Sequence, residues 1–137
     1  MNETLYTIAA TATGGRGGRT ISEDGVVDLP LGKPGSTSNP TANPETLFAA
    51  GYAACYNGAL ALVARREGLD ASAARTTANV LFGSTDTGFG LAVELTSHIP
   101  GVDEPTAQKL AEMAHEVCPY SKATRGNIDV TVVGKPA

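Results

Sequence analysis

The sequence has only two cysteines, Cys55 and Cys118, among its 137 residues, and they form no Cys-x-x-Cys pair. Two thiols so far apart in the chain are not expected to form a permanent disulfide in a reducing compartment. They are either two inert buried thiols, the common state of cysteine in a protein core, or a redox couple. Both alternatives remain open from the spacing alone.

Positive charge is also scarce, because ten Lys and Arg stand against fourteen Asp and Glu, a formal net charge of −4. This balance argues against nucleic-acid binding, which needs clustered cations for phosphate contacts. The first five residues, MNETL, lack the basic start and apolar run of a secretion signal, so we expect a cytoplasmic protein. The length predicts a single domain over residues 1–137.

Metal-binding and phosphate-binding motifs are missing as well. The two histidines, His98 and His115, are not accompanied by the further ligands that a zinc site needs, so no metal is expected. His115 as the base of a cysteine–histidine hydrolase is a weak alternative. The glycine-rich stretch 14–18 lacks the Gly-Lys-Ser/Thr ending of a phosphate loop.

One long helix, over residues 43–68, is the element around which the chain is expected to be organised. Asn43 suits its N-cap, Glu45 complements the positive end of the helix dipole, and Gly68 is placed to end it. No charged residue lies in 47–64, so the helix is predicted to be buried on every side. Its many Ala and Gly residues make it too weakly apolar for a membrane span, and no membrane association is expected.

The remaining pattern predicts short strands joined by turns. A second helix over 103–117 has an apolar stripe that includes Cys118, and Pro119 ends it. Residues 120–127 are expected to form a connection. Strands are expected at 5–13, 19–22, 26–31, 76–82, 91–96 and 128–133, with turns at 14–18 and 83–90 and a loop at 32–41. The fold class is α+β, with antiparallel strands in two groups around two helices.

Arg16, isolated among glycines, is a candidate for activating Cys55, because a cation favours the thiolate form. The simpler interpretation is a solvated turn residue. Glu45 could hold the guanidinium in a bidentate pair, or could merely complement the helix dipole. Glu45 and Cys55 lie ten positions apart, about 15 Å along a straight helix. Either Arg16 bridges that gap, or the helix bends, or Glu45 and Arg16 reach the Cys55 of another subunit. We favour a site at a dimer interface.

Three segments in order resemble one known family. Residues 43–55, NPETLFAAGYAAC, resemble the peroxidatic-cysteine helix of the organic hydroperoxide resistance proteins of the OsmC/Ohr family. Residues 117–128, VCPYSKATRGNI, resemble their second-cysteine segment, and 12–16, ATGGR, resemble their arginine turn. The chain departs from its relatives at Gly17, where they often have Asp or Asn, and in a short 32–41 loop.

The resemblance implies a thiol peroxidase that reduces organic hydroperoxides to alcohols. It implies Cys55 as the peroxidatic thiol, Cys118 as the resolving thiol and Arg16 with Glu45 as the activating pair. It also implies an intertwined homodimer whose antiparallel sheets wrap two central helices, no bound cofactor, and re-reduction by an external dithiol on lipoylated proteins. We expect an apolar substrate wall, made by Leu47, Phe48 and Tyr52.

Two rival hypotheses remain beside this one. The first is a broader OsmC-type peroxidase with a different substrate preference. The second is a non-catalytic binding protein whose two thiols only fill space in the core.

Overall fold

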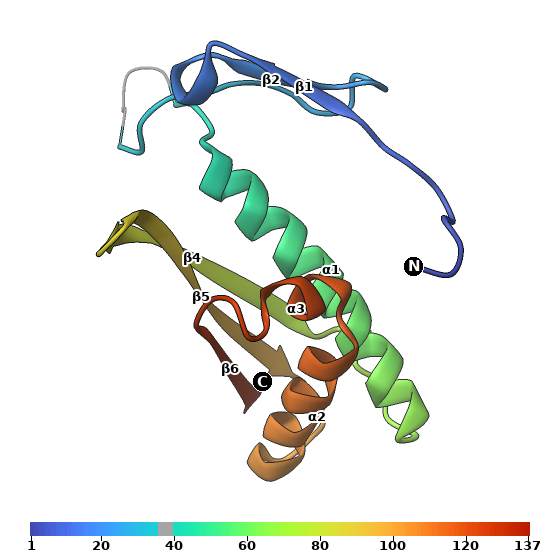
Figure 1. Cartoon of the computed structure of the whole chain (residues 1–137). Coiled ribbons are helices and arrows are strands. Elements are labelled where there is room, and N and C mark those ends of the chain that lie inside the picture. Colours follow the sequence, from blue (N-terminus) through green and yellow to red (C-terminus); the bar gives the residue numbers. More distant parts are fainter. Residues whose placement is uncertain (36–39) are drawn as a thin grey trace. The chain divides into compact units, whose positions relative to one another are not determined.

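The computed structural model describes residues 1–35 and 40–137 (Figure 1). The chain divides into two compact units, Met1–Leu47 and Phe48–Ala137, and each unit is described by itself. Part of the loop expected at 32–41, residues 36–39, lies outside the described residues. The assignment of residues 1–137 to one domain stays a prediction.

The N-terminal unit contains a small antiparallel sheet of the three strands that the sequence predicts. Its order is β1-β2-β3, and β1 is shorter than the expected strand because its pairing with β2 begins only at Ala10, opposite Ser22. In the preceding segment, Leu5 and Tyr6 are each 83% exposed. The strands are β1 (Ala10–Thr13), β2 (Arg19–Ser22) and β3 (Asp28–Pro30).

The turn between β1 and β2 is built from glycine for a steric reason. Gly14 has φ +78°, a left-handed conformation that favours glycine. A Cβ at Gly18 would lie 1.7 Å from the carbonyl oxygen of Thr13, so no larger residue fits that position. Between these glycines, a short 3-10 helix, η1 (Gly15–Gly17), carries Arg16.

The sheet of the C-terminal unit differs from the sequence prediction in one respect. Strands β4 (Arg75–Thr85) and β5 (Gly88–Ile99) form the expected antiparallel hairpin. The last strand, β6 (Val130–Pro136), pairs with β5 in parallel, from Val93↔Val130 onward. The expectation of purely antiparallel sheets is therefore wrong for this unit. The physical reason is the helical crossover between β5 and β6, which returns the chain to the end of the sheet where β5 began.

That crossover consists of two helices, α2 (Glu104–Val117) and α3 (Pro119–Thr124). The Asp103 carboxylate caps α2 by accepting the backbone N–H of Thr106 at 3.0 Å. The sequence prediction missed α3, which begins at Pro119 and occupies the first part of the expected 120–127 connection. A six-residue helix is too short for a periodic signal, and only the proline at its start marks it.

The long helix α1 (Pro44–Arg66) is present with both predicted ends. The Asn43 side chain accepts the N–H of Thr46 at 2.9 Å, and Gly68 has φ +75° just after the last turn. One face of α1 packs into the core with α2 and the sheet. The buried residues on that face are Tyr52, Tyr56, Ala59, Leu60, Val63 and Ala64.

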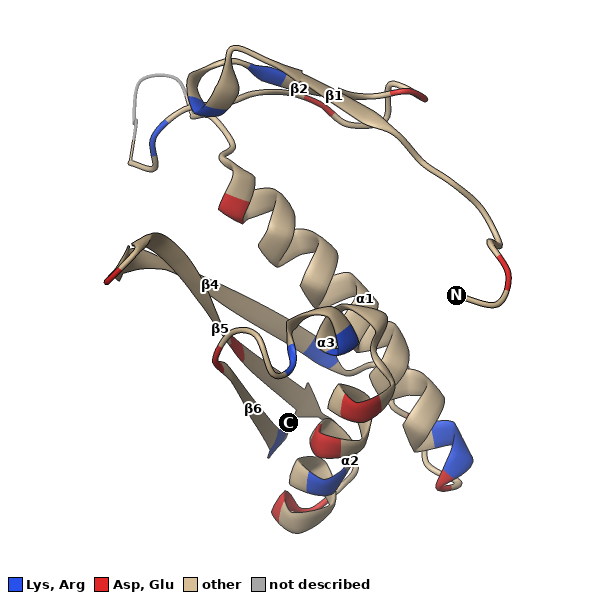
Figure 2. Ribbon diagram, viewed as in Figure 1, with Lys and Arg blue, Asp and Glu red and all other residues tan. Residues whose placement is uncertain are grey.

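The prediction that α1 is buried on every side is wrong for the single chain. Its other face carries Ala50, Ala54, Gly58 and Leu62, spaced by four residues, and all are exposed. Figure 2 shows that α1 has an acidic residue at its start, basic residues at its end and none of either between. α1 is long and apolar enough to cross a membrane by length and composition alone, and the core helices of soluble proteins can be so as well.

Candidate active site

The C-terminal unit brings the two cysteines together. Cys55 lies in the middle of α1, and Cys118 lies at the junction where α2 ends and α3 begins. Their sulfur atoms are 3.7 Å apart, with the Cys118 thiol placed to donate to Cys55. Both thiols are free, and Cys118 is fully buried while Cys55 keeps some exposure. The two sulfurs of a disulfide are about 2.0 Å apart, so a small movement of these sulfurs toward each other is sufficient to form the bond.

The surroundings of Cys55 act on its thiol in opposite directions. Burial raises the pKa of Cys55 above its ordinary value, because a thiolate loses hydration in the core. The backbone N–H of Tyr120, in the first turn of α3, acts to lower that pKa, and the neighbouring Cys118 thiol raises it further. Since burial dominates, a nucleophilic Cys55 needs an additional source of positive charge.

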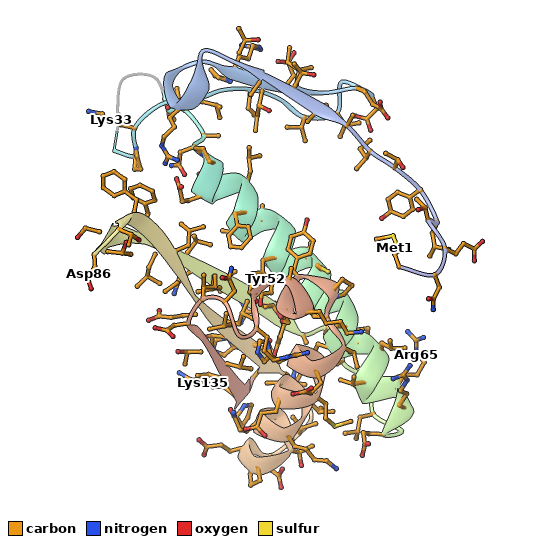
Figure 3. All side chains as sticks on the ribbon, in the orientation of Figure 1. Met1, Lys33, Tyr52, Arg65, Asp86 and Lys135 are labelled. Atoms are coloured by element: carbon orange, nitrogen blue, oxygen red, sulfur yellow. The ribbon has the colours of Figure 1, made fainter. Side chains whose placement is uncertain are left out.

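Aromatic rings pack against one another on the part of α1 that precedes Cys55. The rings of Phe48 and Tyr52 meet edge to face with centroids 5.7 Å apart, and Tyr52 lies 5.8 Å from Tyr120. Gly51 leaves room for the last of these rings, because a Cβ there would lie 3.3 Å from a carbon of Tyr120. Tyr52, labelled in Figure 3, is fully buried. The roles of Leu47, Phe48 and Tyr52 as a substrate wall stay predictions.

The Tyr52 hydroxyl joins α1 to α3 through hydrogen bonds that the sequence did not predict. It lies 2.9 Å from the Ser121 hydroxyl and 2.9 Å from the Thr124 hydroxyl. Ser121 also lies 2.8 Å from Nδ1 of His115 on α2. The available signal was weak: a tyrosine within an uncharged helix requires a polar partner once it is buried, but the sequence does not say which one.

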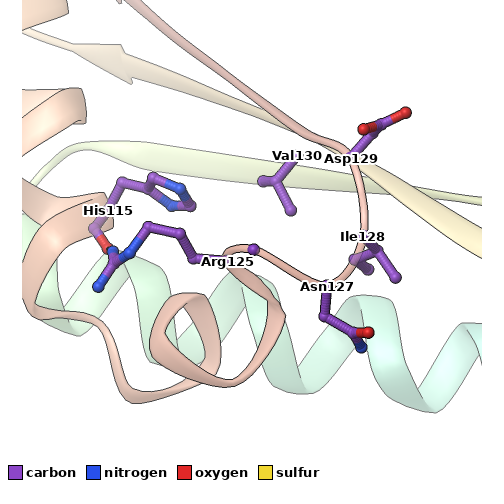
Figure 4. A pocket seen from close by; sticks show the side chains of 7 residues that line it. His115, Arg125, Asn127, Ile128, Asp129 and Val130 are labelled. Carbon is purple, nitrogen blue, oxygen red and sulfur yellow. The ribbon is translucent and has the colours of Figure 1, made fainter.

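His115 lies at the edge of a pocket of about 430 Å³ on the C-terminal unit (Figure 4). Burial and the nearby Arg125 cation lower the pKa of His115. The Arg125 guanidinium donates to the carbonyl oxygen of His115 at 2.9 Å. The hydrolase alternative would need His115 to act on a cysteine, whereas the polar partner found for its Nδ1 is Ser121.

Within the N-terminal unit, Arg16 and Glu45 form the predicted ion pair. Nη2 of Arg16 lies 2.5 Å from Oε2 of Glu45, and the side chains are 56% and 16% exposed. Arg16 is held by η1, and Glu45 lies in the first turn of α1. The guanidinium holds the pKa of Glu45 below its ordinary value. The expected action of this pair on Cys55 joins the two units and stays a prediction.

The chain is similar to known proteins over most of its length. The family model described as OsmC-like protein matches residues 35–133, which include Glu45, Cys55 and Cys118. The chain belongs to the OsmC-like family. It is 48% identical over 132 residues to an organic hydroperoxide resistance protein of Xanthomonas axonopodis pv. citri, with 93% of each chain covered. It is 46% identical over 138 residues to OhrA of Bacillus subtilis, covering 96% of this chain and 97% of the relative.

Solved structures of OsmC-like proteins agree with the fold. An organic hydroperoxide resistance protein from Elizabethkingia anophelis superposes with a TM-score of 0.89 at 48% identity, covering 98% of this chain and 99% of the other. OhrB of Bacillus subtilis superposes with a TM-score of 0.89 at 40% identity, covering 98% and 100%. The predicted α+β, OsmC/Ohr-like fold and the family resemblance are confirmed.

The ion pair leads to a prediction about the titration of Glu45 in this OsmC-like protein. Because Arg16 stabilises the carboxylate, Arg16→Ala should raise the pKa of Glu45 toward its ordinary value. The pair's contribution to stability is present above the unfolded-state pKa and is lost as the pH falls through the lower folded-state value. Carboxyl ¹³C NMR titration measures the shift.

A matched control is Arg19→Ala, which breaks another ion pair of the N-terminal unit, between Arg19 of β2 and Asp28 of β3 at 2.6 Å. This control should leave the Glu45 titration unchanged. Identical Glu45 curves in wild type and Arg16→Ala would contradict the assignment.

Proposed function

We propose that this chain is a cysteine-based peroxidase that reduces organic hydroperoxides to alcohols and so serves in organic hydroperoxide resistance. Membership of the OsmC-like family and similarity to proteins named for that resistance support the proposal. The single observation that carries it is the 3.7 Å separation of two free thiols that are 63 residues apart in the chain. A core that used cysteine only to fill space has no need for this juxtaposition.

In the first step, the Cys55 thiolate attacks the terminal oxygen of a hydroperoxide, R–O–OH. The S–O bond forms as the O–O bond breaks, and the electron pair leaves on the alkoxide. Cys55 becomes a sulfenic acid, and the alkoxide takes up a proton to give the alcohol. The sulfur is oxidised by two electrons and the peroxide is reduced by two.

Arg16 is proposed to supply the charge that this step needs. Burial raises the pKa of Cys55, so a guanidinium beside the sulfur would stabilise the thiolate and the negative charge developing on the oxygens. Glu45 is proposed to orient that guanidinium, and their 2.5 Å ion pair supports the role.

In the second step, Cys118 resolves the sulfenic acid. Its sulfur attacks Cys55, the S–S bond forms, and the hydroxyl leaves with the thiol proton as water. An external dithiol then exchanges the disulfide back to two thiols and is itself oxidised to a disulfide. The family resemblance suggests lipoyl groups of lipoylated proteins as that dithiol, with no cofactor bound to the chain.

A homodimer in the cytoplasm is the proposed working form. The exposed face of α1 carries small and apolar residues at Ala50, Ala54, Gly58 and Leu62, which permit close approach of another backbone. The N-terminal segment also exposes Leu5, Tyr6 and Ile8. A second copy of the chain would cover these surfaces. A monomer mass in sedimentation equilibrium would contradict this form.

Mass spectrometry after one equivalent of an alkyl hydroperoxide tests the chemistry. We expect the loss of two hydrogens and a tryptic peptide pair that links Cys55 to Cys118. Cys118→Ala should still consume one equivalent but stop at the sulfenic acid, or become overoxidised when more peroxide is present.

Cys55→Ser is the decisive control for this experiment. It should consume no peroxide, because the remaining thiol is buried. Full consumption by Cys55→Ser would instead support the non-catalytic hypothesis in which both thiols only fill the core.

The proposed role of Arg16 predicts a change in the pH dependence of Cys55 alkylation. In Cys118→Ala protein, where Cys55 is the one remaining thiol, Arg16→Ala should raise the pKa of Cys55, because the thiolate loses a neighbouring cation. At neutral pH, alkylation by iodoacetamide should then slow, on the order of tenfold, because less of Cys55 is thiolate. Superimposable profiles would argue against a guanidinium next to the sulfur.

An apolar wall of Leu47, Phe48 and Tyr52 is proposed to favour alkyl hydroperoxides over hydrogen peroxide. Each buried methylene contributes about 0.8 kcal/mol, so kcat/KM for a tertiary-alkyl hydroperoxide should exceed that for hydrogen peroxide by roughly tenfold or more. Phe48→Ala should reduce this ratio. Equal kcat/KM values for both oxidants would contradict the wall and favour the broader OsmC-type alternative.

A further inference from the structure

We propose that the buried hydroxyl cluster of Tyr52, Ser121 and Thr124 is a positioning device, which holds the resolving cysteine in register with Cys55 for disulfide formation. The inference rests on the proposed peroxidase function and adds positioning residues to it. None of the three hydroxyls contacts the peroxide in the proposed mechanism. They act by fixing α3, the helix that begins directly after Cys118.

The spacing of the contacts on the two helices is matched. On α1, Tyr52 precedes Cys55 by three residues, and across from it Cys118, the N-cap residue of α3, precedes Ser121 by three. Tyr52 contacts Ser121 at 2.9 Å, and Cys55 contacts Cys118 at 3.7 Å. Residues three apart lie on the same face of a helix, and an N-cap side chain lies beside the third helical residue. The hydroxyl contact and the sulfur contact therefore join the same two faces, one turn apart.

The hydroxyl contacts are the stronger of the two connections. The thiol is a weak donor and sulfur a weak acceptor, and the disulfide does not yet exist when the sulfenic acid forms. By contrast, Tyr52 and Ser121 are fully buried and Thr124 is 6% exposed, and buried hydroxyls are costly to leave without partners. Before the disulfide forms, the hydroxyls thus hold the register of α3 on α1.

One arrangement of protons satisfies all the hydrogen bonds of the cluster. The Thr124 hydroxyl donates to the carbonyl oxygen of Ser121 at 3.2 Å, so it must accept from Tyr52. Tyr52 then accepts from the Ser121 hydroxyl, and Ser121 accepts from Nδ1–H of His115. Neutral His115 therefore carries its proton on Nδ1. Because protonation adds the second proton at Nε2, the chain of bonds remains intact when His115 becomes charged.

The same helix also acts on the reacting sulfur. The Tyr120 backbone N–H, in the first turn of α3, lowers the pKa of the Cys55 thiol, and the Lys122 N–H donates to the Cys118 carbonyl at 3.0 Å. A shift of α3 would move both the N–H donor and the resolving thiol. Loss of the hydroxyl cluster should therefore affect the partition of the sulfenic acid, between condensation with Cys118 and further oxidation.

Two substitutions at Thr124 separate hydrogen bonding from packing. Thr124→Val keeps the volume and removes the hydroxyl, whereas Thr124→Ser keeps the hydroxyl and removes a methyl group. With an excess of an alkyl hydroperoxide, mass spectrometry measures the ratio of sulfinic acid at Cys55 to the Cys55–Cys118 disulfide. We expect Thr124→Val to raise this ratio about tenfold, equivalent to about 1.4 kcal/mol, and Thr124→Ser to stay near wild type.

The outcomes distinguish this inference from the proposed function. Wild-type protein that forms no disulfide would overturn the peroxidase mechanism itself. A disulfide in wild type, with the same ratio in Thr124→Val, would overturn only the positioning role. An increased ratio in Thr124→Ser instead of Thr124→Val would assign the effect to packing and also overturn it.

Two further measurements cover the case in which Thr124→Val does not fold. Tyr52→Phe keeps the ring, removes the central hydroxyl and should raise the same ratio. In wild-type protein, ¹⁵N NMR should find His115 protonated at Nδ1 and bare at Nε2 above its pKa. The opposite tautomer would overturn the bonded chain from His115 to Thr124.

Discussion

The arrangement of the C-terminal unit depends on the need of two buried tyrosine hydroxyls for polar partners. Tyr52 and Tyr56 lie one turn apart on the uncharged middle part of α1, and both are fully buried. The Tyr52 hydroxyl bonds to Ser121 and Thr124 of α3, and the Tyr56 hydroxyl donates to the Ala111 carbonyl of α2. The junction of α2 and α3 is thereby fixed to α1 on both sides. Cys118 lies at that junction, so it faces Cys55.

The sheet brings Cys118 close to Cys55 because it determines the path of the crossover between β5 and β6. Because β6 pairs in parallel with β5, the chain between them must return along the sheet, and α2 and α3 make that return. Close packing of α2 on β6 requires a glycine, since a Cβ at Gly134 would lie 2.0 Å from the carbonyl oxygen of Ala107. Backbone contact at this position keeps α2, and with it Cys118, near the core.

The proposed chemistry needs a site that is shielded from water and that also stabilises a negatively charged thiolate. Burial excludes water from Cys118 and limits its access to Cys55, but it also raises the pKa of the Cys55 thiol, which works against nucleophilic attack. The two units therefore have complementary parts in the proposal. The C-terminal unit holds both thiols, and the N-terminal unit holds the Arg16–Glu45 ion pair that would supply the charge.

The sequence alone was sufficient for features that depend on local interactions. The ends of α1 followed from Asn43 and Gly68, and an ion pair of Arg16 with Glu45, one of the alternatives that their chemistry left open, is present through one nitrogen–oxygen contact. Three ordered motifs were sufficient to predict the family. Other features were decided by tertiary structure, because they depend on which groups meet across the core. These are the parallel pairing of β6, the helix α3, the partial exposure of α1 and the 3.7 Å approach of the two sulfurs. No local pattern could name Ser121 and Thr124 as the partners of Tyr52, about 70 residues away in the chain, since a buried hydroxyl specifies only that some partner must exist.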